Sequence, residues 1–65
     1  GPEDLIVLKA FADRLQDWAD IESVLLRGHD LNWPQIIDRL RPLVELKEEP
    51  EILTKLDELR YRTEA

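Results

Sequence analysis

The chain has 65 residues, of which 43% are hydrophobic and 37% are charged, and its formal net charge at pH 7 is −6. This length allows one domain with one small core, and the composition is typical of a folded protein rather than a disordered one. The acidic charge argues against direct nucleic-acid binding and against binding to anionic membranes, because lysine and arginine drive both. With no cysteine and a single histidine, His29, the sequence predicts no metal site and no cofactor.

The apolar segments are too short to cross a membrane. The longest uninterrupted apolar run is Leu5–Leu8, whereas a spanning helix needs ~20 residues. No signal peptide is visible, so a cytoplasmic location is expected. The first two residues, Gly1-Pro2, resemble the remnant of a removed affinity tag, and the sequence contains no methionine. We therefore expect an expressed fragment with a single helical domain over residues 3–65.

The first predicted helix, at about residues 3–13, is apolar over most of its circumference. One stripe at helical spacing is formed by Leu5, Leu8, Phe11 and Ala12, and it is widened by Ile6, Val7 and Ala10. A helix of this kind is usually packed between neighbours. It carries more apolar surface than a 65-residue monomer needs to bury, which favours contact with a partner or with a missing domain.

The second predicted helix covers about residues 17–27. Asp17 is a competent N-cap, and Asp20 follows three residues later, in the favourable first turn. Gly28 is placed as the residue that ends the helix. Neither proline nor glycine separates the first two helices, so one long bent helix is an alternative.

Two more helices are predicted, at about residues 33–47 and 50–62. Asn32 is expected to cap the first of them, with Gln35 at the position that completes a capping box. Pro42 lies inside this helix and should kink it, because proline removes one backbone hydrogen bond. Pro50 suits the first turn of the last helix. With no strand signal, the expected fold is an all-α bundle of three to four helices.

One group of charged residues surrounds the break between the first two helices. Lys9, Arg14, Asp17 and Asp20 follow the spacing K-x4-R-x2-D-x2-D. A compact hairpin would bring Lys9 near the two carboxylates, which could orient both cations toward a nucleotide phosphate. The alternative is purely structural: a helix cap, a favourable first-turn charge and solvated ion pairs worth ~0–1 kcal/mol.

This motif resembles one in the C-terminal region of the AbiE-type toxin nucleotidyltransferases and of the minimal nucleotidyltransferases, in the DNA polymerase beta-like superfamily. The resemblance implies that Lys9, Arg14, Asp17 and Asp20 support a nucleotide site. In that family a Gly-Ser pair and paired acids on an upstream sheet carry out catalysis, and this chain has neither. It also has Leu15 where many relatives have proline. We therefore expect a non-catalytic fragment, whose parent would be a nucleotidyltransferase of the toxin–antitoxin type.

Two other hypotheses belong to different classes. The first is a helical interaction module that forms a homodimer or binds a partner helix. Trp18, Trp33 and Phe11 would then be candidate interface residues, because aromatic side chains dominate interface hot spots. The second is a stand-alone helical bundle without a molecular partner. The sequence does not separate a homodimer from a missing catalytic domain.

Overall fold

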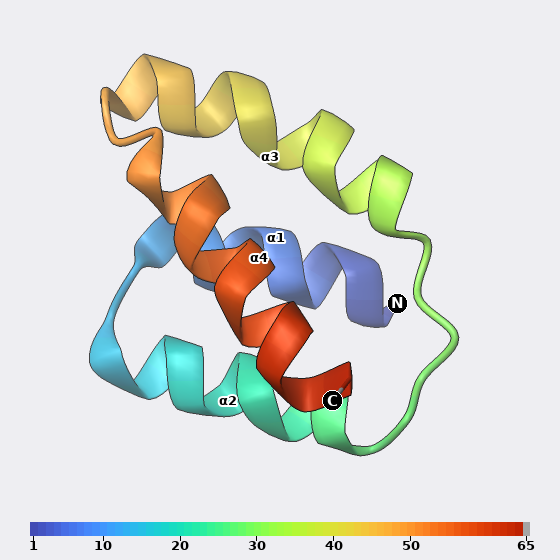
Figure 1. The fold of residues 1–65 in the computed structure, drawn as a ribbon. Coiled ribbons are helices and arrows are strands. Elements are labelled where there is room, and N and C mark those ends of the chain that lie inside the picture. The colour runs from blue at the N-terminus through green and yellow to red at the C-terminus, as the bar shows by residue number, and fades with distance from the viewer. Residues whose placement is uncertain (65) are drawn as a thin grey trace.

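The structure, a computed structural model, describes residues 1–64, which form four α-helices joined by short connections (Figure 1). Their bounds are Pro2–Ala12 for α1, Leu15–Leu26 for α2, Trp33–Lys47 for α3 and Glu51–Glu64 for α4. Residues 1–64 contain no strand, and the predicted all-α fold is confirmed. The predicted domain extends to Ala65, which lies outside the described residues.

Helix α1 lies between α2 and α3, and α4 crosses one side of this layer (Figure 1). α1 contacts all three other helices, and α4 also contacts α2 and α3. The core consists of buried side chains from every helix: Ile6, Val7, Ala10, Trp18, Ile21, Val24, Ile36, Leu40, Val44, Ile52, Leu56 and Leu59. None of the helices in residues 1–64 is long and apolar enough to cross a membrane.

The face of α1 that enters the core is not the first stripe found in the sequence. Ile6, Val7 and Ala10 are buried, whereas Leu5 is 42% exposed and Leu8 is 65% exposed. Both faces of α1 are apolar, so the periodicity of the sequence does not decide which one points inward. α1 therefore buries one apolar face and presents the other to solvent.

The break between α1 and α2 comes earlier than the sequence predicts. Asp13 ends α1 in the left-handed conformation, with φ 55° and ψ 38°, and Arg14 is the extended N-cap of α2. Aspartate is among the residues that tolerate the left-handed region. The two helices are therefore separate, and the alternative of one long bent helix is excluded.

The prediction that Asp17 is the N-cap of α2 is wrong. Asp17 is the third residue of the helix, and one of its carboxylate oxygens, Oδ2, accepts a hydrogen bond from the backbone N–H of Arg14 at 3.3 Å. An acidic side chain at this position can reach back to the N-cap amide, as in a capping box. The carboxylate of Asp17 thus accepts the hydrogen bond of the N-cap amide from within the first turn of α2.

The other helix ends follow the sequence more closely. The side chain of Asn32 accepts a hydrogen bond from the backbone N–H of Gln35 at 3.2 Å, which confirms the predicted cap of α3. α3 continues through Pro42 to Lys47, and the predicted kink at this proline stays a prediction. α4 begins at Glu51, one residue after the predicted start at Pro50.

Candidate functional site

The four charged residues of the sequence motif meet at the break between α1 and α2, and we call them the hinge cluster (Lys9, Arg14, Asp17 and Asp20). Arg14 and Asp17 make the closest contact. The Nε of Arg14 donates to Oδ2 of Asp17 at 2.6 Å, and its Nη2 donates to Oδ1 at 3.2 Å. This two-point contact fixes the plane of the guanidinium group as well as its distance from the carboxylate.

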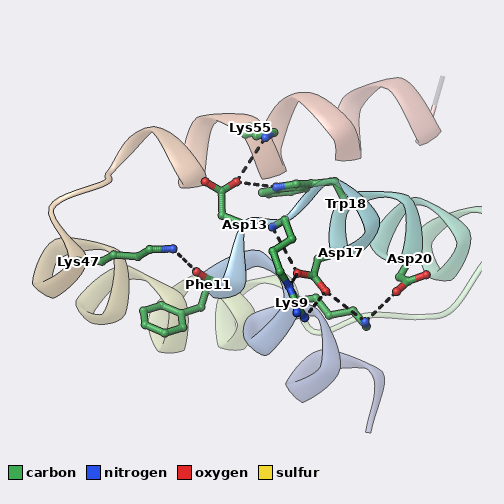
Figure 2. A network of polar contacts seen from close by, with 9 residues as sticks. Lys9, Phe11, Asp13, Asp17, Trp18, Asp20, Lys47 and Lys55 are labelled. Carbon is green, nitrogen blue, oxygen red and sulfur yellow. Dashed lines mark hydrogen bonds and ion pairs between the residues drawn. The ribbon is translucent and has the colours of Figure 1, made fainter.

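Lys9 joins the cluster from α1. Its Nζ donates to Oδ2 of Asp20 at 2.8 Å and to Oδ1 of Asp17 at 3.4 Å (Figure 2). Asp17 therefore contacts both cations, and Asp20 holds Lys9 from the next turn of α2. The structure brings all four predicted residues together, although the backbone role of Asp17 differs from the predicted one.

Burial divides the cluster into an inner carboxylate and an outer rim. The side chain of Asp17 is 1% exposed, whereas those of Arg14 and Asp20 are 63% and 55% exposed. The Arg14 side chain, followed by the weaker contribution of Lys9, holds the pKa of Asp17 below its usual value, against the opposing effect of burial. The hydrogen bond to Asp20 is the main cause that raises the pKa of Lys9. Both shifts favour the charged forms of Asp17 and Lys9.

The lowered pKa of Asp17 predicts a loss of stability in acid. A group whose pKa is lower in the folded state stabilises the fold above its unfolded pKa, here near 3.8, and this contribution is lost as the pH falls through the folded value. Urea denaturation of the wild type should give a constant midpoint near neutrality and a falling midpoint in this acid range. The denaturation midpoint of the Asp17→Asn variant should fall less steeply as the pH decreases. An equal slope for the variant and the wild type would contradict the assignment.

A second group of polar contacts lies next to the hinge and was not predicted. The indole Nε1 of Trp18 donates to Oδ1 of Asp13 at 2.7 Å, and the Nζ of Lys55 donates to the same oxygen at 3.3 Å (Figure 2). Lys55 also lies over the indole, 4.8 Å from the ring centroid. The hydrogen bond from Trp18 is the main cause that lowers the pKa of Asp13. These contacts tie α4 to the residue at which α1 ends.

The three aromatic residues proposed for an interface occupy different environments. Trp18 is only 8% exposed and belongs to the core. Trp33 is half-buried, with the guanidinium of Arg60 4.5 Å from its ring centroid. Phe11 is 36% exposed at the outer face of α1. An interface role stays a prediction for all three, and Trp18 offers little surface to a partner.

An apolar groove between α2 and α4 lies beside the second group of contacts rather than beside the hinge cluster. Leu15, Trp18 and Ala19 line it from α2, and Lys55 and Leu59 are among its residues from α4. The hinge cluster is thus separate from this groove. Among residues 1–64, no group of three or more His, Cys, Asp or Glu side chains could hold a metal ion.

The chemistry open to the hinge cluster is binding of an anion. A guanidinium has five N–H donors, and Asp17 occupies the edge formed by Nε and Nη2. The Arg14 side chain is 63% exposed. The opposite edge of its guanidinium is therefore the one that an anion could reach. The Nζ of Lys9 contacts Oδ1 of the same carboxylate at 3.4 Å, so Asp17 holds both cations beside it.

Comparison with known proteins found no relative of this chain. No family model matches the chain. Neither the curated proteins nor the solved structures gave a match. The resemblance drawn from the K-x4-R-x2-D-x2-D spacing therefore stays a hypothesis.

Proposed function

We propose that this chain is a helical, non-catalytic part of a nucleotidyltransferase-like protein, and that its hinge cluster orients phosphate groups of the nucleotide. In this proposal the parent protein is a cytoplasmic enzyme of the toxin–antitoxin type, and catalysis belongs to a part of the parent outside this chain. The observation that supports the proposal is the position of Asp17. Its buried carboxylate contacts Lys9 and Arg14 at once, although four residues lie between these cations in the sequence.

The geometry of Arg14 suits phosphate recognition. Arginine is preferred over lysine where two parallel hydrogen bonds to a phosphate are needed, because its donors form a rigid planar fork. Asp17 holds one edge of this fork at 2.6 Å and 3.2 Å, so less side-chain entropy is lost when the other edge binds a ligand. Lys9 supplies a second, more compact positive charge.

The balance of charge limits what the chain does alone. Two carboxylates oppose the two cations of the cluster, and the whole chain carries a net charge of −6. Phosphate binding by the isolated chain is therefore weak. In the proposed parent protein, the rest of the nucleotide is bound by the catalytic part, and the cluster fixes the direction of the phosphates.

A titration with inorganic triphosphate, followed by NMR, tests this function. The side-chain resonances of Arg14 should shift with added triphosphate, and Arg14→Gln should weaken binding at least about tenfold, because a hydrogen bond to a charged group is worth ~1.5–3 kcal/mol. Arg39→Gln is the matched control, since Arg39 is 50% exposed and also paired with an aspartate, Asp4. Equal losses in the two variants would contradict a site at the hinge cluster.

One observation favours a second candidate function, a helical interaction module. The outer face of α1 exposes Leu5, Leu8 and Phe11, with 42%, 65% and 36% of their surfaces accessible. Contiguous apolar side chains on a small folded protein commonly mark an interaction site. In this reading the hinge cluster fixes the angle between α1 and α2, and the outer face of α1 binds a partner.

A further inference from the structure

Asp13, Trp18 and Lys55 form a compact group beside the hinge cluster, and we call them the hinge latch. One carboxylate oxygen of Asp13, Oδ1, accepts hydrogen bonds from the indole Nε1 of Trp18 at 2.7 Å and from the Nζ of Lys55 at 3.3 Å (Figure 2). Lys55 also lies 4.8 Å from the centroid of the indole ring. Each member therefore contacts both of the others, although they come from the end of α1, from α2 and from α4.

The backbone of Asp13 lies between the two cations of the hinge cluster. Its N–H donates to the carbonyl oxygen of Lys9 at 3.1 Å, and the next residue is Arg14. Asp13 has φ 55°, in the left-handed region, whereas Arg14 is extended, so the chain changes direction at this pair. Residues other than glycine keep a left-handed conformation where surrounding contacts hold them in it. The position of Asp13 therefore sets the directions from which the two cations approach Asp17.

Trp18 contacts both residues of this break. Its indole donates to the carboxylate of Asp13, and its backbone N–H donates to the carbonyl oxygen of Arg14 at 3.1 Å. Trp18 also directly follows Asp17, whose carboxylate contacts both cations. Because Trp18 is only 8% exposed, core packing fixes its ring. Lys55 connects this arrangement to α4 by a contact that spans 42 residues.

We propose that the hinge latch makes α4 part of the phosphate site, because Lys55 holds Asp13 against Trp18 and thereby fixes the break between α1 and α2. The fixed break sets the spacing of Lys9 and Arg14. Asp13 and Lys55 are positioning residues in this account and touch no phosphate themselves. Without Lys55 the break gains freedom, and the ordering of the two cations around a ligand then costs more entropy.

The latch contributes orientation more than stability. The side chains of Lys55 and Asp13 are 55% and 27% exposed, and exposed ion pairs contribute little to the free energy of unfolding. A merely structural role for Lys55 would therefore leave the environment of Arg14 unchanged. The inference predicts instead that the loss of Lys55 alters the contact between Arg14 and Asp17.

This coupling can be measured by NMR before any phosphate is added. In Lys55→Gln, the indole Nε1–H resonance of Trp18 and the side-chain Nε–H resonance of Arg14 should both shift. Lys55→Arg keeps the charge and should bring both resonances back toward their wild-type positions. Arg62→Gln is the matched control, since it removes one positive charge from an exposed residue of the same helix, and it should move neither resonance. A shift of the Trp18 resonance without one of Arg14 would overturn the inference.

The inference rests on the proposed phosphate site, so inorganic triphosphate is added in a second step. Lys55→Gln should weaken binding at least about twofold more than Arg62→Gln does. Asp13→Gly keeps a residue that accepts the left-handed conformation and removes a negative charge, so charge alone predicts tighter binding, whereas the inference predicts weaker binding.

The two proposals fail in different ways. Equal losses in Lys55→Gln and Arg62→Gln, or tighter binding in Asp13→Gly, would overturn the latch and leave the phosphate site standing. A wild type that binds no triphosphate would contradict the proposed function, and the ligand-free resonances would then decide whether the latch holds the break. Lys55→Gln leaves the buried core unchanged, so its result counts even if Asp13→Gly fails to fold.

Discussion

Leu40→Ala is expected to remove a large share of the free energy of unfolding. The side chain of Leu40 is completely buried at the centre of α3, and removing a buried leucine costs ~2–5 kcal/mol. At ~0.05–0.15 kcal/mol per residue, a chain of 65 residues has a total stability of only roughly 3–10 kcal/mol. The expected loss is therefore a large fraction of the total stability. Urea denaturation followed by circular dichroism measures it.

The same helix offers a matched control. Leu46 is 84% exposed, so Leu46→Ala removes the same atoms from a site without a packed environment and should change the stability by less than ~0.5 kcal/mol. Similar losses at the two positions would mean that α3 does not pack through the face that contains Leu40. The contrast therefore tests the orientation of α3 in the bundle.

Asp17→Ala is expected to lower the melting temperature by on the order of 10 °C. The variant loses the hydrogen bond to the Arg14 amide and the two-point contact with the Arg14 side chain together. It also leaves Lys9 with Asp20 as its remaining carboxylate. Thermal denaturation measures the change, and the double variant with Arg14→Ala should lose less than the sum of the two single losses, because the residues act as a pair.

Asp20→Ala controls for the loss of a carboxylate as such. Asp20 contacts Lys9 at 2.8 Å but is 55% exposed, and exposed ion pairs contribute little to stability. Its melting temperature should stay close to that of the wild type. If Asp20→Ala and Asp17→Ala destabilised the chain equally, the buried position of Asp17 would have no special structural role.

The helices were predictable because their signals are local. The apolar period of Ile36, Leu40 and Val44 and the cap at Asn32 depend on residues within a few positions of one another. The start of α2 was misplaced for a related reason. The rule that ranks cap residues by type favours aspartate over arginine, whereas the chain satisfies the amide of Arg14 with a carboxylate from inside the helix.

The hinge cluster was partly predictable from spacing. Lys9, Arg14, Asp17 and Asp20 are close in sequence, so any compact hairpin brings them together. The contact of Lys55 with Asp13 spans 42 residues and depends on how α4 crosses the other helices. No pattern of neighbouring residues in the sequence predicts this contact. The same limit applies to α1, whose two apolar faces differ only in what the tertiary fold places against them.

The central claim is that Asp17 acts by orienting Lys9 and Arg14, and one titration tests it directly. Inorganic triphosphate would be added to the folded Asp17→Asn and Asp20→Asn variants, with the affinities read by NMR. Both substitutions remove one negative charge from the cluster, so charge alone predicts tighter binding in both. The account predicts tighter binding for Asp20→Asn and weaker binding for Asp17→Asn, because only the second releases the guanidinium of Arg14. Tighter binding in both variants would contradict it.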